Sequence, residues 1–377
     1  MNNGCYLVKK NKITKPKFFY VILYLILLIG IIFTLNNSFL YQKPIAKIIA
    51  IDETYVKETE EGNYGYKTAI YEQNIKAIIK NTQYKDRVIT IKNTYHKGEV
   101  YTQRYHKNDE VFISLNITKD DIKTAHIEGY KRDKYIVVLT SLFIIIITII
   151  GKSKGLLSFI SVIANIFLFN IVIYFNAKGI SLILLSFVSA LLSCTICLTL
   201  VSGFNKKTIS AIISSCCGLT ITMLISLIVI HISNYNGLRF DQMELLTRPY
   251  EGIFISEIIM GGLGAIMDIA ITISSSLNEI IEKNNQITLK ELITSGKNIG
   301  RDVTSTMINV LFFTYICGAI PNLVLYFKNG ISISSLINEF ISLEMARALI
   351  GGIGICITII ISIFITILLY KRSLNHE

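Results

Sequence analysis

Long blocks rich in isoleucine and leucine constrain the fold of this chain more than any other feature of its sequence. A helix of about 20 residues crosses the roughly 30 Å hydrocarbon core of a bilayer, and each block is close to that length. Because 52% of the 377 residues are hydrophobic, the composition is typical of a membrane protein. Eight blocks are predicted to span the membrane: residues 18–35, 135–150, 156–175, 180–201, 208–232, 252–281, 303–327 and 345–370.

These spans predict a polytopic α-helical membrane protein with one soluble insertion after its first helix. The anchor helix follows five lysines, and no Ala-x-Ala cleavage site comes after it, so it is expected to stay uncleaved. The expected domains are a basic tail, the anchor, the soluble domain, a seven-helix membrane domain and a short tail, at residues 1–17, 18–35, 36–134, 135–370 and 371–377.

Lysine and arginine in the short loops predict the orientation, because cytoplasmic loops retain positive charge. With the N-terminus inside, the cytoplasmic segments hold 15 of the 37 Lys and Arg residues, and the short outer loops hold 5. The other 17 lie in the soluble domain, whose length exempts it from the rule. Both termini are therefore expected in the cytoplasm. The net charge of +11 follows from this topology, and no nucleic-acid partner is expected.

The soluble domain is expected to be exported and to consist of β-strands. Period-two alternation of polar and β-branched residues, which is typical of strands, occurs at residues 45–51, 87–92, 99–103 and 111–116. Short strands separated by turn signals favour a small antiparallel barrel of the OB or SH3-like type. His96, His106 and His126 are far apart in this sequence, which indicates solvated side chains. A spacer or a docking module for an envelope protein is the expected role.

The cysteines predict neither a disulfide nor a cofactor site. Cys5 lies in the N-terminal tail, and the other six lie inside predicted spans. Cys194 and Cys197 are one helical turn apart, a spacing that favours packing in an apolar helix. No disulfide, metal or other cofactor is therefore expected.

A polar stripe marks the sixth predicted span. At 3.6 residues per turn its members share one face of the helix. Each of them is small or able to form hydrogen bonds, so this face is expected to pack inward. Gly261, Gly264 and Ser275 are the expected packing positions. The stripe consists of Glu257, Gly261, Gly264, Asp268, Thr272, Ser275 and Glu279.

Asp268 is the most informative member of the stripe, because a carboxylate at mid-membrane costs about 2.5 to 3.5 kcal/mol. One interpretation is a proton or cation carrier, with Thr272 in its surround and Glu257, about 16 Å away along the helix axis, at the outer end of a path. The other is structural: Asp268 hydrogen-bonds a neighbouring helix, and Glu257 is an interfacial carboxylate.

The segment after the stripe predicts a partner for it. Residues 282–300 alternate apolar and charged side chains, which predicts an amphipathic helix along the inner membrane surface. At the start of the next span Asp302, Thr306 and Asn309 share a face by their spacing, and we expect them to face the Asp268 stripe. Arg301 and Asp302 are equally compatible with an interfacial anchor and a helix cap.

These residues resemble the YibE/F-like bacterial membrane proteins. The resemblance is carried by Gly-x-x-Gly-Ala-x-Met-Asp at residues 261–268 and by Asn-Ile-Gly-Arg-Asp-x-x-x-Thr-x-x-Asn at residues 298–309. The single anchor, the exported β domain and the loop at residues 236–246 extend it over nearly the whole chain. It implies this architecture and a bacterial plasma-membrane location, and it implies no particular activity.

A fainter similarity links the same helices to the RND-type helices of SecD and SecF. There a Gly-rich helix with an Asp leads through an amphipathic helix to one with Gly, Thr and Asn, and such helices use the proton gradient. This chain has no second exported domain and no duplicated half. A homodimer or a second membrane subunit is the expected source of the missing half.

Two functions are compatible with these observations. The first is a membrane transporter or proton-coupled export factor acting on an unknown small molecule, with Asp268 as carrier and Thr272, Thr306 and Asn309 around it. The second is a scaffold in the lipid bilayer whose exported domain docks an envelope protein. An enzyme is not expected, because Asp302 lies at the membrane boundary and the predicted spans hold neither His-Glu-x-x-His nor Gly-x-Ser-x-Gly.

Overall fold

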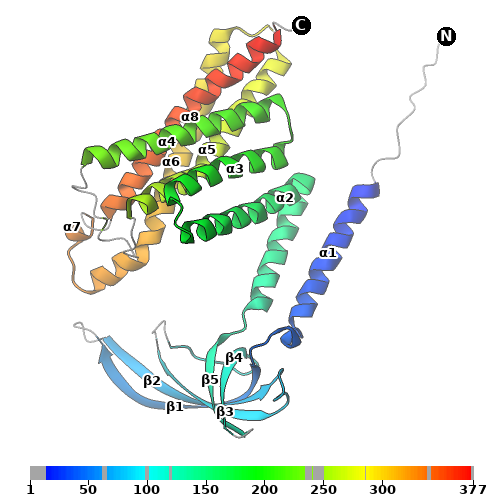
Figure 1. Cartoon of the computed structure of the whole chain (residues 1–377), viewed down its shortest axis with the longest axis vertical. Coiled ribbons are helices and arrows are strands. Elements are labelled where there is room, and N and C mark those ends of the chain that lie inside the picture. Colours follow the sequence, from blue (N-terminus) through cyan, green and yellow to red (C-terminus); the bar gives the residue numbers. More distant parts are fainter. Residues whose placement is uncertain are drawn as a thin grey trace, which may run out of the picture. The chain divides into compact units, whose positions relative to one another are not determined.

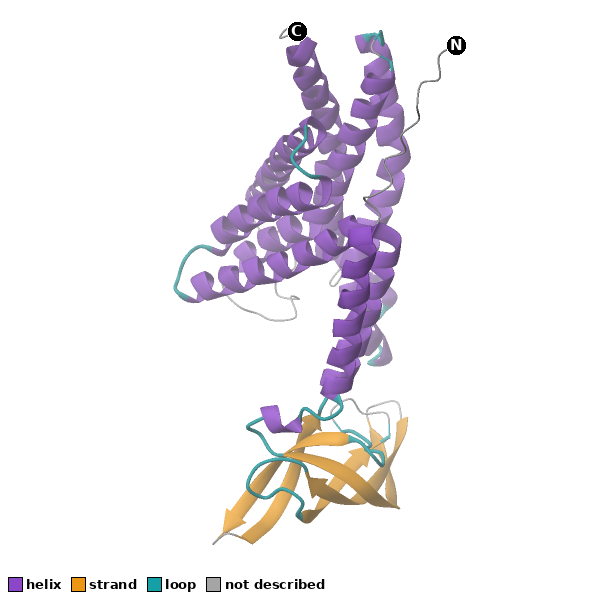
Figure 2. Cartoon of the chain, turned by 90° about the vertical axis from the view of Figure 1, so that its right-hand side faces the viewer, coloured by secondary structure: helices purple, strands orange, loops and turns teal. Residues whose placement is uncertain are grey.

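The chain is mostly helical and carries an antiparallel sheet near its N-terminus (Figure 1). It divides into two compact units, Met1–Ile150 and Gly151–Glu377. The strands belong to the first of them, as the colouring of Figure 2 shows. The computed structural model describes residues 14–61, 66–97, 102–118, 121–233, 240, 250–284, 286–337 and 341–374.

Six helices in the described part of the chain are long and apolar enough to cross a membrane. The helix α1 (Thr14–Thr34) precedes the sheet and has a shorter apolar part, Phe19–Thr34. Two short helices, η1 (Ser38–Leu40) and α7 (Ile333–Leu336), lie in connections. The six long helices are α2 (Asp133–Ala177), α3 (Leu182–Ser202), α4 (Lys206–Ser233), α5 (Tyr250–Lys283), α6 (Leu289–Lys328) and α8 (Ser342–Leu374).

Two of the predicted spans, residues 135–150 and 156–175, lie within α2. Lys152 interrupts this helix, with φ 50° and ψ −129°. A positive φ is uncommon for any residue other than glycine and does not occur inside a regular α-helix. The two parts of α2 are therefore separate regular stretches, and the break coincides with the boundary between the two units.

The prediction of a separate surface helix at residues 282–300 is wrong. Residues 289–300 form the first turns of α6, which continues to Lys328 without interruption. A capping box starts this helix: the Thr288 hydroxyl accepts a hydrogen bond from the Glu291 amide, and the Glu291 carboxylate accepts one from the Thr288 amide. Such a box satisfies the first free amides of a helix, so the helix begins at the cap rather than at residue 303, where the span is predicted to begin.

The sheet of the first unit has five strands in the order β3-β2-β1-β4-β5, and every neighbouring pair is antiparallel. The edge strands β3 and β5 approach each other, with Cα pairs within 8 Å. Ile48, Ile75, Ile91 and Ile113 lie in the core of this unit. The strands are β1 (Ile45–Glu61), β2 (Tyr66–Ile79), β3 (Val88–His96), β4 (Glu110–Thr118) and β5 (Asp121–Tyr130).

Three of the four predicted strands correspond to β1, β3 and β4. The fourth, at residues 99–103, falls partly outside the described residues, and Thr102 and Gln103 are not in a strand. The sequence did not predict β2, in part because Gln73 occupies a buried position where the alternation calls for an apolar residue. Strand β5 was missed as well, since Ala125 is its one buried side chain among those described.

Lys131 joins the sheet to the helices of the first unit. Its Nζ lies 3.0 Å from Glu110 Oε2 and 3.3 Å from Asp133 Oδ1, and it donates to the carbonyl oxygen of Thr34 at 3.3 Å. The side chain is 1% exposed. Asn37 donates to the other oxygen of Asp133 at 2.6 Å. The end of α1 and the start of α2 are thereby tied to β4.

The second unit is built around α5, which packs against α3, α4, α6 and α8. Two reciprocal contacts join α4 to α8: Thr358 lies over Gly218, and Thr222 lies over Gly354. A Cβ atom at either glycine would overlap the threonine hydroxyl. Small residues of this kind let transmembrane helices approach closely, which explains why α4 and α8 can share the interior with α5.

Candidate functional site

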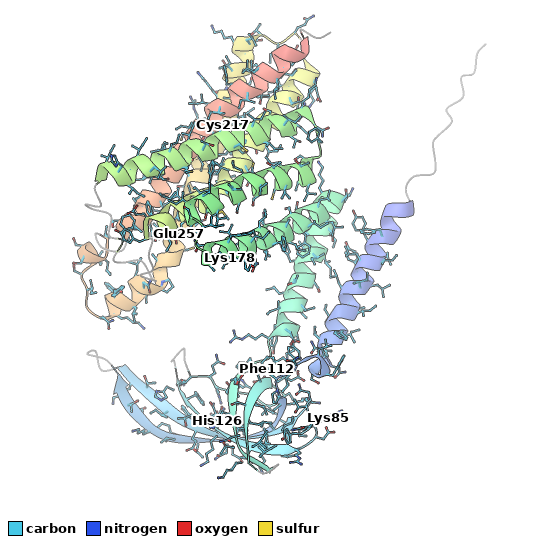
Figure 3. All side chains as sticks on the ribbon, viewed as in Figure 1. Lys85, Phe112, His126, Lys178, Cys217 and Glu257 are labelled. Atoms are coloured by element: carbon cyan, nitrogen blue, oxygen red, sulfur yellow. The ribbon has the colours of Figure 1, made fainter. Side chains whose placement is uncertain are left out.

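The polar stripe of α5 faces away from the centre of the second unit. Glu257, Gly261, Gly264 and Asp268 are exposed, and Thr272 and Ser275 are half-buried; Figure 3 labels Glu257 on this helix. The buried face of α5 is apolar instead and includes Ile258, Ile259, Ile266, Ile269 and Ile273. The prediction that the stripe packs inward is therefore wrong for the second unit taken by itself.

Hydroxyl groups from two other helices, α4 and α8, explain why the apolar face of α5 is buried. Ser and Thr can hydrogen-bond the carbonyl one turn earlier and so fit an apolar interior. Ser214, Thr222 and Ser226 of α4 do this, as do Thr358 and Thr366 of α8. These small side chains leave room for the isoleucines of α5. The interior of the unit therefore takes these hydroxyl groups from α4 and α8 rather than from the stripe.

A buried cluster of three hydroxyls links α4, α5 and α8 and was not predicted. Ser210 Oγ lies 2.8 Å from Thr366 Oγ1 and 3.2 Å from Ser274 Oγ, and Thr366 lies 3.3 Å from Ser274. The sequence signal is weak, because serine and threonine are scattered through every span. The cluster holds the three helices together by hydrogen bonds in an apolar interior.

Glu257 has a cationic partner. Arg347 of α8 places Nη2 2.6 Å from Glu257 Oε2 and Nη1 2.5 Å from Glu344 Oε1. The Arg347 side chain is 8% exposed, and its guanidinium lies 5.4 Å from the ring centre of Phe254. Glu257, predicted as the outer end of a path, thus takes part in an ion pair between α5 and α8.

Tyr315 of α6 fixes how α6 sits against α5. Its hydroxyl donates to the carbonyl oxygen of Glu257 at 3.3 Å. It also covers Gly261, where a Cβ atom would come within 2.5 Å of the hydroxyl oxygen. Gly261 therefore lets Tyr315 pack closely against α5. At Gly264, in contrast, a Cβ atom would meet nothing within 4 Å.

Asp268 lies one turn beyond Gly264 on the same open face. Within the described ranges, no ion pair or hydrogen bond reaches its side chain. The carboxylate thus differs from Glu257, which is paired with Arg347. It is available to a ligand, a proton or another chain.

The polar residues of α6 are exposed too. Asp302, Thr306 and Asn309 all point away from the core, and the Thr306 hydroxyl donates to the carbonyl of Val303 at 2.8 Å. The helices α5 and α6 run antiparallel and touch where Tyr315 covers Gly261. Seven residues further along α5, or about 10 Å, lies Asp268, and the same distance in the same direction on α6 leads back to Ile308. Asp268 is therefore level with the segment between Thr306 and Asn309. No hydrogen bond or ion pair joins the two sets among the described residues, and together they form an exposed polar surface.

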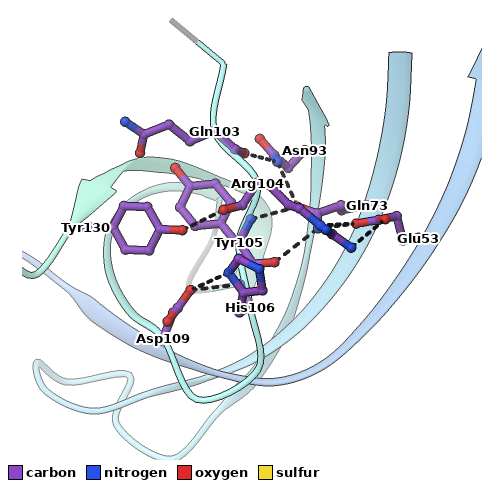
Figure 4. Close-up of polar contacts among 9 residues, drawn as sticks. All are labelled: Glu53, Gln73, Asn93, Gln103, Arg104, Tyr105, His106, Asp109 and Tyr130. Carbon is purple, nitrogen blue, oxygen red and sulfur yellow. Dashed lines mark hydrogen bonds and ion pairs between the residues drawn. The ribbon is translucent and has the colours of Figure 1, made fainter. Parts of the chain in front are cut away.

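The β domain contains a polar network that fixes the connection between β3 and β4 (Figure 4). The buried Gln73 donates to Glu53 at 2.9 Å and to the carbonyl of Tyr105 at 3.1 Å, and its own carbonyl accepts from the Tyr105 amide at 3.1 Å. Arg104 forms two hydrogen bonds with Glu53, at 3.0 and 3.1 Å. Burial raises the pKa of Glu53, but the hydrogen bonds from Gln73 and Arg104 outweigh it and hold the pKa below its ordinary value.

The histidines of this domain occupy separate places. His106 Nδ1 lies 3.8 Å from Asp109, whereas His126 lies on β5, where Figure 3 labels it. Across the described residues, no group of three His, Cys, Asp or Glu side chains is placed to hold a metal ion.

Comparison with known families covers most of the chain. The family described as YibE/F-like protein matches residues 139–372, and the YibE/F family N-terminal domain matches residues 39–130. No curated protein and no solved structure matches the chain.

Proposed function

The chain belongs to the YibE/F-like protein family, and we propose that it acts as a proton-coupled membrane transporter or export factor. Asp268 is the proton carrier. Thr272, Thr306 and Asn309 form its hydrogen-bonding surround, with Asp302 at the inner boundary. Asp268 carries the proposal because it is a carboxylate in the middle of an apolar helix with no partner among the described residues.

The free-energy cost of an ionised Asp268 inside the membrane supports its role as a proton carrier. An ionised carboxylate at mid-membrane costs about 2.5 to 3.5 kcal/mol, and protonation removes most of that cost. Asp268 is therefore expected to hold a proton while its surroundings are apolar and to release it when a polar path opens. The Glu257–Arg347 pair forms the polar outer end of that path, about three helical turns away.

The proposed topology has eight spans, with both termini in the cytoplasm of a bacterium. The break at Lys152 divides α2 into two spans, and α1 supplies another. The basic residues beside these ends support this orientation. The strand order and the approach of β3 to β5 support a partly closed barrel of the OB type for the exported domain.

We further propose that a second copy of the chain or a second membrane subunit covers the α5–α6 surface. Polar side chains inside a membrane face other protein or a water-filled path rather than lipid. The surface offers small residues, hydroxyls and an amide, which is the composition of helix interfaces in membranes. The unknown substrate, a small molecule or an envelope protein, would pass beside this interface.

A scaffold is the second candidate, and the contacts of Lys131 with Glu110, Asp133 and Thr34, called here the Lys131 network, favour it. That network ties the β domain to both α1 and α2 through a buried cation. Such a connection suits a domain that holds an envelope partner at a fixed place. In this case Asp268 contributes only to helix association.

Carbodiimide labelling tests the carrier role. Dicyclohexylcarbodiimide modifies protonated carboxyl groups in apolar surroundings, so the purified full chain should gain one adduct at Asp268, detected by peptide mass mapping. Labelling should decrease as the pH rises. It should disappear in Asp268→Asn and persist in Glu279→Gln, which removes a surface carboxylate from the same helix. Absence of labelling at Asp268, or labelling there that does not depend on pH, would contradict the proposal.

A further inference from the structure

A groove of about 560 Å³ runs between the first half of α6 and the second half of α8. Its walls are apolar for most of its length, and Ile360 and Phe364 on the α8 side are 68% and 62% exposed. The α6 side contributes Lys297, Arg301 and Thr304. An apolar channel with two cations along one wall is therefore open to the surroundings of the second unit.

Two glycines create this groove. Ile359 packs against Gly300, where a Cβ atom would come within 2.5 Å, and Ile363 packs against Gly296, where the corresponding distance is 2.8 Å. The two helices touch at these points, and the side chains on either side of the contact line are left to form the walls. Lys297 and Arg301 are one turn apart and so project from the same face of α6.

The two cations have no carboxylate partner among the described residues. Neither Lys297 nor Arg301 forms an ion pair or a hydrogen bond there. Three carboxylates at this end have other partners: Glu291 caps α6, Glu279 pairs with Lys283, and Glu282 accepts from Asn278. Asp302 follows Arg301 in the chain and is exposed. Two uncompensated positive charges beside an apolar wall attract a ligand that is both anionic and apolar.

The arrangement of the two walls selects one such ligand. The contacts of Gly296 with Ile363 and of Gly300 with Ile359 place Lys297 and Arg301 at the same level as Ile360 and Ile363. The two cations therefore lie beside the exposed apolar wall of α8 over the same stretch of the groove. A phospholipid combines the matching chemistries, an anionic phosphate joined to apolar acyl chains.

We infer that this groove binds an anionic glycerophospholipid, with the phosphate between Lys297 and Arg301 and an acyl chain along Ile360, Ile363 and Phe364. Basic pockets between helices on the cytoplasmic side of a membrane bind lipid headgroups of this type. Free phosphate lacks the apolar part that the groove accommodates, and a zwitterionic lipid carries a cation that the two basic residues repel.

Native mass spectrometry of the full chain in detergent tests the inference, with dioleoylphosphatidylglycerol as the probe. The double variant Lys297→Gln/Arg301→Gln should bind it about thirtyfold more weakly, at roughly fivefold for each basic residue near an anionic lipid. Lys283→Gln/Lys290→Gln removes the same charge at the same end of the unit but outside the groove, and it should bind as the native protein does. Arg301→Lys, which keeps the charge, should also bind.

A second pair of variants tests the apolar wall and does not depend on charge. Ile360→Trp fills the groove and should weaken binding, whereas Leu368→Trp, on an exposed position of α8 outside it, should not. Thermal unfolding of each variant separates lost binding from lost folding. Equal binding of phosphatidylglycerol and phosphatidylcholine, equal binding of glycerol phosphate, or retained binding in the folded double variant would overturn the inference.

Discussion

Arg347 of α8 reaches across to Glu257 of α5, and the Nη2–Oε2 distance is 2.6 Å. The guanidinium is almost fully buried, so it depends on this carboxylate and on Glu344 for its charge balance. The outer end of the polar stripe is therefore held by a contact between two helices, and the stripe becomes open only beyond Gly261.

Glu257→Gln should destabilise the second unit. A buried cation that loses one partner costs about 3 to 5 kcal/mol. We expect roughly 1 to 3 kcal/mol here, because the Glu257 side chain is 44% exposed and exposed pairs contribute less. Thermal unfolding in detergent measures the difference. Glu251→Gln, at a carboxylate on the same helix with no ion pair among the described residues, should leave the midpoint unchanged, and an unchanged midpoint in Glu257→Gln would refute the structural role.

The two glycines of the stripe should respond differently to alanine. Gly261→Ala places a methyl group against the Tyr315 hydroxyl and should cost about 1 to 3 kcal/mol by overpacking. Gly264→Ala meets nothing within 4 Å, and the helix propensity of alanine should stabilise the protein by about 0.5 to 1 kcal/mol. Unfolding midpoints of the two variants test this contrast. Equal effects would contradict the packing of Tyr315 on α5.

Lys131→Met should loosen the junction between the β domain and the first helices. It leaves Glu110 and Asp133 without their shared cation, at a cost of about 3 to 5 kcal/mol. Lys43→Met removes a cation that is 70% exposed and pairs with Glu128, so it should cost about 0 to 1 kcal/mol. Hydrogen exchange of β4 in the full chain should rise in the first variant and not in the second. Similar exchange in both would argue against a buried network.

The segment Thr102–Asp109 should become less protected in acid. Because the folded pKa of Glu53 is depressed, its hydrogen bonds stabilise the fold fully above the unfolded value of about 4.3. That stability is lost as the pH falls through the lower, folded value. Hydrogen exchange in this segment, compared with a neighbouring strand, should therefore rise in acid. Glu53→Gln should remove the pH dependence, and Glu72→Gln, at an exposed pair with Lys92, should keep it.

The sequence predicted helices and strands more reliably than it predicted their faces. The apolar blocks define α3, α4, α5 and α8 because length and composition alone decide whether a segment suits a membrane. The side of α5 that becomes buried, and so the direction in which the Asp268 stripe faces, depends on the side chains that the other helices place in the interior. Serines and threonines of α4 and α8 supply hydroxyl groups to the interior, and their hydrogen bonds to their own helix leave no periodic signal.

Helix capping and contacts between distant residues explain the other differences between the predicted and the observed structure. Thr288 and Glu291 start α6 well before residue 303, where the span is predicted to begin, so the expected surface helix is part of α6. Gln73 occupies a core position of β2 because the backbone of Tyr105 satisfies its amide. A contact between residues so far apart in the chain cannot be read from alternation. The partner of Glu257 was missed for the same reason, since Arg347 lies on a different helix.

Proton flux into liposomes that contain the purified full chain, followed with an internal pH dye under an imposed pH gradient, tests the carrier role of Asp268 most directly. Native protein and Glu279→Gln should conduct protons at the same rate. Asp268→Asn, which keeps the size of the side chain but cannot release a proton, should reduce the rate to that of empty liposomes, and Asp268→Glu should retain part of it. Native flux in a folded Asp268→Asn variant, or no flux from the folded native protein, would contradict the account.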